Sequence, residues 1–270
     1  MKKRCGLAAL IIATAMFTVA CQNNSSSNTS TSSQSSKSSQ VQKSKTSVKT
    51  NKKQEQSHSQ SQAPQVSRLT QMNRQLKKVF PKTLLPQTDG LGQGSDKLNV
   101  RYSISNGEND IYYSVGNNAL SFNNPAVKKE LPFAVLSEMT NLNDSQADDL
   151  INFQADEQGL PQVKVDTDVT ATQQSGAGQT YLNWVQGKWS FTVHANALAE
   201  QNPLPTAKQV VQLAKKYKLP ETQTHGSMRI QVGYSYGSLE NVITWKENGH
   251  VYQLRAHSLD TAFKMVSSMK

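Results

Sequence analysis

Residues 241–256 read NVITWKENGHVYQLRA, and this stretch shows most directly how the chain folds. Apolar and polar side chains alternate on both sides of Asn248-Gly249, as they do in strands that bury one face. Asn-Gly also favours a tight turn between two strands. The stretch therefore predicts an antiparallel hairpin, with strands at 241–246 and 250–256.

A helix is predicted directly after this hairpin. Ser258 is a typical N-cap residue, because its hydroxyl can accept a hydrogen bond from the first helical turn. Apolar residues then recur at helical spacing, and they are Leu259, Ala262, Phe263, Val266 and Met269.

Two more hairpins are predicted upstream, each around a glycine turn. They comprise residues 98–104 with 111–115, and residues 181–186 with 188–195. Residues 173–179, rich in Gly, Ser and Gln, predict a loop between elements. The three hairpins either arose separately or are copies of one hairpin-plus-helix unit.

Other segments complete the predicted domain. Helical spacing or capping residues predict helices over about 68–80, 144–153 and 205–219, with Asp144 as the N-cap of the second. Strand patterns occur at 132–140, 162–169 and 228–236. The order of elements predicts an α+β fold, in which a mainly antiparallel sheet built of hairpins carries packed helices.

The N-terminus has the pattern of an export signal. Lys2, Lys3 and Arg4 are followed by 16 uncharged residues, Cys5 to Ala20. This apolar run is shorter than the roughly 20 residues needed to cross a bilayer. The segment therefore predicts a signal peptide over residues 1–21 that ends at Cys21 and is removed before that residue.

The end of this segment resembles the lipobox of bacterial lipoproteins. Val19, Ala20 and Cys21 match that pattern, whereas Thr18 stands where an aliphatic residue is usual. The resemblance implies acylation of Cys21 and anchoring to the outer face of the cell membrane. An uncleaved membrane anchor and simple secretion are the alternatives.

Composition divides the rest of the chain in two. Residues 22–66 are almost wholly Gln, Asn, Ser, Thr and Lys, which predicts a disordered tether. Residues 67–270 form the predicted globular domain, either as one body or as subdomains at 67–160 and 161–270. Anchor, tether and domain then follow one another along the chain.

The formal charge of +10 is uneven along the chain. Residues 1–21 carry three positive charges, and six Lys against one Glu give +5 over 22–66. The domain has 20 Lys and Arg against 18 Asp and Glu, or +2. A nearly neutral domain argues against nucleic acid as a partner.

The C-terminal run from Ile243 to Leu254, with the helix over 258–269, is similar to a domain of unknown function in Gram-positive envelope proteins. Together with the lipobox and the Ser/Lys-rich tether, it resembles uncharacterised surface lipoproteins of lactic-acid bacteria and related organisms. This resemblance implies an extracytoplasmic location and supplies no catalytic residues.

No catalytic or metal-binding pattern emerges from the sequence. His194, His225, His250 and His257 are scattered, and there is no Gly-x-Ser-x-Gly motif. Asp166 and Asp168 begin like a calcium loop, but Ala171 stands where that loop needs Gly. Gly90, Gly92 and Gly94 are spaced like part of a phosphate-binding loop but follow no predicted strand. We expect no cofactor and no metal.

Aromatic residues gather in the C-terminal strands, where they are either core or a ligand platform. The candidate ligand contacts are Trp184, Tyr234, Tyr236 and Trp245. The sequence thus predicts a non-catalytic binding or structural module, with a cell-wall polymer, peptide or lipid as ligand. A carrier of a hydrophobic ligand and an envelope-polymer hydrolase are the alternatives.

Overall fold

The computed structural model describes residues 66–233 and 237–270, all within one compact unit. The predicted signal peptide with Cys21, the predicted tether up to residue 65, and Tyr234 and Tyr236 lie outside the described residues.

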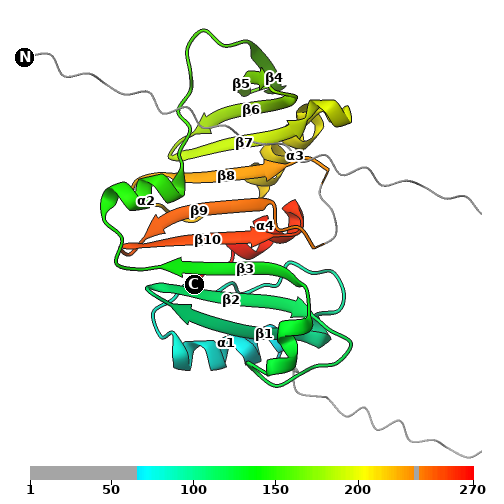
Figure 1. The fold of residues 1–270 in the computed structure, drawn as a ribbon, viewed down its shortest axis with the longest axis vertical. Coiled ribbons are helices and arrows are strands. Elements are labelled where there is room, and N and C mark those ends of the chain that lie inside the picture. The colour runs from blue at the N-terminus through cyan, green and yellow to red at the C-terminus, as the bar shows by residue number, and fades with distance from the viewer. Residues whose placement is uncertain (1–65, 234–236) are drawn as a thin grey trace, which may run out of the picture. The chain divides into compact units, whose positions relative to one another are not determined.

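One sheet of ten strands forms the centre of the fold (Figure 1). Its strands are β1 (Leu98–Ser105), β2 (Glu108–Val115), β3 (Pro132–Met139), β4 (Gln162–Asp166), β5 (Val169–Gly176), β6 (Gln179–Gln186), β7 (Trp189–Asn196), β8 (Gly226–Gln231), β9 (Asn241–Glu247) and β10 (His250–Ala256). Across the sheet they run β1-β2-β3-β10-β9-β8-β7-β6-β5-β4. Only β7 and β8 pair in parallel, so the predicted α+β fold with a mainly antiparallel sheet is confirmed.

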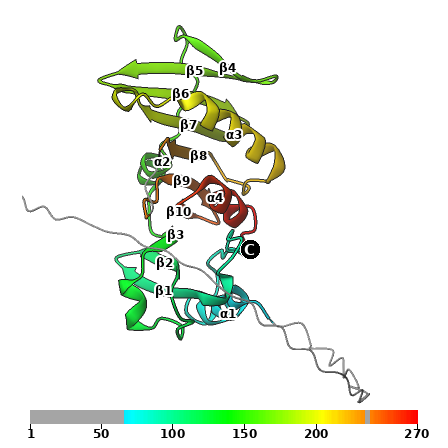
Figure 2. The same cartoon turned by 90° about the vertical axis from the view of Figure 1, so that its right-hand side faces the viewer.

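Four α-helices accompany the sheet, and they are α1 (Arg68–Val79), α2 (Asp144–Ile151), α3 (Pro203–Lys216) and α4 (Leu259–Val266). Figure 2 shows α1, α3 and α4 on one side of the sheet and α2 on the other. The main core lies beneath α1, α3 and α4, whereas α2 buries only a small cluster around Ile151 and Val251. One face of the sheet is therefore covered and the other is largely open.

Local sequence explains where the helices begin. The side chains of Ser67 and Ser258 accept hydrogen bonds from the backbone of α1 and α4, as N-caps do. The prediction of Asp144 as N-cap of α2 is wrong by one residue. Asn143 holds that position, in a reciprocal capping box with Gln146.

Two turns are tighter than the sequence pattern predicts. Asn106 and Gly107 both have positive φ, and this conformation joins β1 and β2 through only two residues. The predicted loop at 173–179 is wrong, because β5 continues to Gly176 and the turn is Ala177-Gly178. The polar end of β5 is exposed on both faces, so it lacks the apolar alternation that marks a strand.

The strand predicted over 228–236 is shorter in the structure. β8 ends at Gln231, and a loop with positive φ at Gly233 and Gly237 leads to β9. Glycine tolerates this left-handed backbone, which interrupts the pleat of a strand.

The sheet contains two similar units, each a helix followed by three antiparallel strands: α1-β1-β2-β3 and α3-β8-β9-β10. Strands β4 to β7 belong to neither unit. In each, Glu-Asn-x-Ile-x-aromatic begins at or just before the second strand, at Glu108 and at Glu240. The two units meet where β3 pairs with β10, for example Leu136 opposite Leu254. The repeated unit is therefore a helix and three strands, and one sheet spans the predicted boundary at residue 160.

Candidate functional site

The open face of the sheet carries a polar surface beside α2. Along β7, Phe191 and Val193 point into the core, so Thr192 and His194 point to the open face. On β6, Tyr181 and Asn183 lie opposite His194 and Thr192. These four outward positions place hydroxyl, amide, phenol and imidazole groups side by side.

Two adjoining hollows make a groove over this surface. Their volumes are about 370 Å³ and about 300 Å³. Both hollows are lined by Tyr181, Thr192 and Arg229, which form the shared floor. Ligand sites in proteins typically have volumes of roughly 300–1,000 Å³, so the groove has the size of a ligand site.

The segment that follows α2 forms one wall of the groove. Asn152, Gln154 and Glu157 line it there. The backbone N–H of Gln154 donates to Ser190 Oγ at 3.1 Å, and Ser227 Oγ donates to the carbonyl of Ile151. Side chains of β7 and β8 therefore hold this wall against the open face.

Charged groups of both signs border the groove. Arg229 lies on its floor, Glu157 lines one hollow, and Glu240 lines the other together with Leu239. Gln174 Nε2 donates to Glu157 Oε2 at 2.9 Å. The arrangement suits a hydrophilic ligand that offers hydroxyl or amide groups and at least one anionic group to Arg229.

An aromatic stack fixes the far side of the floor. The rings of Tyr181 and His194 are parallel within 10°, with centroids 4.6 Å apart. His194 Nδ1 lies 2.7 Å from Gln231 Oε1, which holds the imidazole in place. Sequence reasoning missed both residues as site residues, although their place opposite buried neighbours in alternating strands would have put them on this face.

Two of the predicted ligand contacts require correction. Trp184 and Trp245 are 1% and 0% exposed and belong to the core. Trp184 stacks on Phe191, and Trp245 stacks on Tyr252. Their side chains point toward the helix-covered face, so they are core residues and not contacts on the open face.

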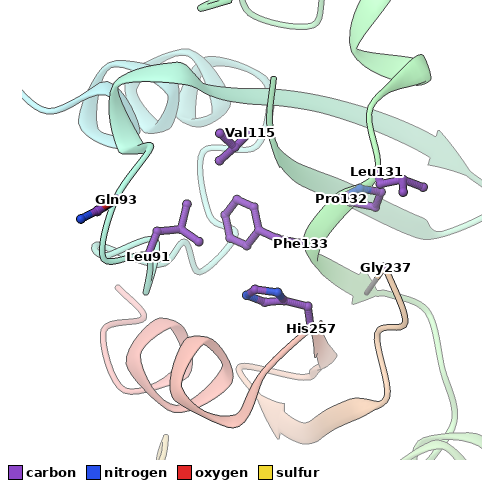
Figure 3. A pocket seen from close by; sticks show the side chains of 8 residues that line it. All are labelled: Leu91, Gln93, Val115, Leu131, Pro132, Phe133, Gly237 and His257. Carbon is purple, nitrogen blue, oxygen red and sulfur yellow. The ribbon is translucent and has the colours of Figure 1, made fainter. Parts of the chain in front are cut away.

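A second, apolar pocket lies where strands β2 and β10 end and β3 begins. Figure 3 shows the Phe133 ring between Val115, Leu91 and His257. Burial lowers the pKa of His257, which favours its neutral form beside these apolar groups. The cavity measures about 160 Å³. A cavity of roughly 150 Å³ holds benzene, so this pocket has room for a small apolar group and not for a full acyl chain.

The aspartates that resemble the start of a calcium loop belong to the β4–β5 turn. Lys215 Nζ of α3 lies 2.7 Å from Asp166 and 3.7 Å from Asp168. Within residues 66–233 and 237–270, no group of three or more His, Cys, Asp or Glu side chains could hold a metal ion. No helix in the same ranges is long and apolar enough to span a membrane.

The chain matches no protein-family model, and searches of curated proteins and of solved structures found no match.

Proposed function

We propose that this chain is a lipid-anchored envelope protein whose domain binds a hydrophilic extracytoplasmic ligand in the groove of the open sheet face. The observation that carries this proposal is the shared floor of Tyr181, Thr192 and Arg229. The groove combines adequate volume, hydrogen-bonding groups and a guanidinium. The proposed role is binding without catalysis.

The location rests on the N-terminal sequence. The basic start, the apolar run and Val19-Ala20-Cys21 support export followed by acylation of Cys21. The acyl chains would hold the protein at the outer face of the cell membrane, and residues 22–66 would serve as the tether. A ligand within the envelope, such as a cell-wall polymer, would then lie within reach of the domain.

The carrier alternative has a specific feature in its favour, which is the apolar pocket around Phe133. Its volume limits the ligand to a small apolar group, so a lipid would insert only part of a chain. Native mass spectrometry of the protein purified from its membrane tests this alternative, since a carrier would retain a ligand mass.

A substitution that fills the groove tests whether the ligand binds there. A soluble chain that starts at Gln22 is compared with its Thr192→Trp and Thr192→Val variants for binding to isolated cell envelope. Trp at this position occupies the floor between Tyr181 and Arg229. Val keeps the shape of Thr, but it replaces the hydroxyl by a methyl group and loses the hydrogen bond to Asn183 Oδ1. Thermal unfolding of each variant checks that it folds.

Loss of envelope binding in the folded Trp variant, with binding largely kept in the Val variant, is the expected result. Equal binding by all three proteins would place the ligand elsewhere. Absence of binding by the unsubstituted chain would refute the binding role itself.

A further inference from the structure

Three arginines lie in one row across the open face of the sheet. The register aligns Arg101 of β1, Tyr112, Val135, Arg255 of β10, Val242 and Arg229 of β8, each beside the next. Arg101 covers the Tyr112 ring at 3.4 Å from its centroid, which confirms that both side chains lie on one face. The domain has only five arginines, so this row holds most of them.

Two of these arginines lie on the first strands of the two similar units, Arg101 on β1 and Arg229 on β8. They are not equivalent in the repeat, in which Tyr112 corresponds to Thr244 and Arg101 therefore to Ser227. Arg255 lies between them, on β10. The row therefore crosses the line where the two units meet.

Although Glu157 and Glu240 border the groove at Arg229, no carboxylate forms an ion pair with this row in the described part of the chain. The ion pairs found there use lysine or histidine, and none includes an arginine. The Nε atoms of Arg229 and Arg255 are buried without a hydrogen-bond partner in the same residues. Residues 234–236, between Gly233 and Gly237, read Tyr-Ser-Tyr and add no charge. Unpaired guanidinium groups favour an anionic partner.

The spacing of the row indicates the shape of that partner. Neighbouring strands lie roughly 4.8 Å apart, so Arg255 and Arg229 are separated by about 10 Å and Arg101 and Arg229 by about 24 Å. A single small anion cannot contact all three. An extended chain with repeated anionic groups can do so if it crosses the strands and enters the groove at Arg229.

We propose that the ligand of the open face is an extended envelope polymer with repeated phosphodiester or carboxylate groups, which lies along Arg101, Arg255 and Arg229. This proposal rests on the proposed function, because Arg229 belongs to the floor of the groove. The domain's net charge of +2 conceals the row, since acidic residues elsewhere balance it.

A polymer chain fits this surface better than a flat bilayer or a nucleic acid. The buried Nε atoms show that Arg229 and Arg255 lie close to the sheet and do not project far from it. A bilayer surface would need projecting cations. Bases would need free aromatic faces for stacking, and one face of Tyr112 is already taken by Arg101 and one face of Tyr181 by His194.

The test uses the chain from Gln22 onward and inorganic polyphosphate as the probe. Affinity is measured for long chains and for tripolyphosphate over a range of salt concentrations. The variants are Arg101→Gln, Arg255→Gln and Arg229→Gln. Arg74→Gln is the matched control, because Arg74 is an exposed arginine on α1, which packs on the covered face. Arg255→Lys replaces Arg255→Gln if that variant does not fold.

Each row variant should weaken long-chain binding by roughly tenfold, the equivalent of about 1.4 kcal/mol. Each row variant should also reduce the slope of log affinity against log salt concentration by about 1 in magnitude. The Arg74 variant should match the parent in both quantities. Tripolyphosphate should bind more weakly than long chains. Polyphosphate binding that Arg101→Gln and Arg255→Gln leave unchanged, or that Arg74→Gln weakens equally, would overturn the proposal.

Competition between polyphosphate, vesicles, DNA and envelope distinguishes the remaining possible ligands. Tighter binding to vesicles of phosphatidylglycerol, or to single-stranded DNA of equal charge, would also overturn the polymer assignment. Envelope binding that the Thr192→Trp substitution abolishes but polyphosphate does not displace would refute the polyanion and leave the groove function intact. Absence of envelope binding in the parent chain would refute the proposed function itself.

Discussion

Tyr252 donates its phenolic hydrogen bond to Glu138 Oε1 at 2.8 Å, within the region where β3 pairs with β10. Glu138 is only 3% exposed, and it also accepts hydrogen bonds from Thr83 at 2.6 Å and Asn109 at 3.1 Å. His250 Nδ1 lies 2.9 Å from Oε1, the oxygen that also accepts from Tyr252. One buried carboxylate thus joins β2, β3, β10 and the loop after α1.

This network makes the stability of the domain depend on pH. Burial alone raises the pKa of Glu138, but the hydrogen bonds from Thr83, His250, Asn109 and Tyr252 outweigh it and lower the pKa. A lowered pKa stabilises the fold above the ordinary Glu pKa of about 4.3, and this stabilisation is lost as the pH falls through the native pKa. We expect Glu138→Gln to lower the free energy of unfolding at pH 7 by about 1–3 kcal/mol. The same substitution should also reduce the loss of unfolding free energy that the parent shows below about pH 4.3.

Urea unfolding at pH 7 and at pH 3.5 measures both effects. Tyr252→Phe is the matched variant, because it removes one donor and keeps the carboxylate. It should cost about 1 kcal/mol at pH 7 and retain most of the acid dependence. An acid dependence that is identical in the parent and in Glu138→Gln would contradict the role of Glu138.

The glycines of the loop after α1 differ sharply in their surroundings. Gly90 has φ of +71°, and a Cβ there would lie 2.8 Å from the Thr261 Cα of α4. A Cβ at Gly92 would meet nothing within 4 Å. We therefore expect Gly90→Ala to lower the free energy of unfolding by about 1–3 kcal/mol. Gly92→Ala should change the free energy of unfolding little. Denaturant unfolding of both variants decides this, and equal effects would mean that the loop does not pack against α4.

The tryptophans report on the packing of the core. Trp184, Trp189 and Trp245 are 1%, 8% and 0% exposed. Their fluorescence should be blue-shifted and resist quenching by acrylamide until the protein unfolds. Added ligand should leave their emission nearly unchanged, because the groove lies on the other face of the sheet. Strong quenching of the native protein would contradict the placement of Trp184 and Trp245 in the core.

Acylation of Cys21 has a direct test. Cells that express the full chain or its Cys21→Ser variant are grown with a clickable fatty acid. We expect label on the parent and none on the variant, because Cys21 is the only cysteine left after the signal peptide. Equal labelling of both proteins would rule out Cys21 as the acylated residue.

Local patterns predicted much of the fold. Alternation around Asn248-Gly249 correctly located β9 and β10, and Ser258 correctly located the start of α4. The pairing of β3 with β10 could not be predicted, because these strands are more than 100 residues apart in sequence and no local pattern specifies their contact. The contact of Glu138 with Tyr252 follows from that pairing and was equally hidden.

The candidate site was harder to predict than the fold. Trp184 and Trp245 share their strand face with apolar Leu182 and Ile243 two residues earlier, a signal that could have placed them in the core. The groove brings together Tyr181, Thr192 and Arg229 from three strands, so it depends on how β6, β7 and β8 pair. The arginine row depends on register across six strands, which composition and net charge do not reveal.

The central claim is that the open face of the sheet binds the ligand, and hydroxyl-radical footprinting with isolated envelope fragments tests it most directly. Tyr181 on the open face and Tyr217 beside α3 are both half-buried tyrosines, so they form an internal comparison. The account predicts that ligand lowers the oxidation of Tyr181 and of Leu239 and leaves Tyr217 unchanged. Protection of Tyr217 with no change at Tyr181 would contradict it.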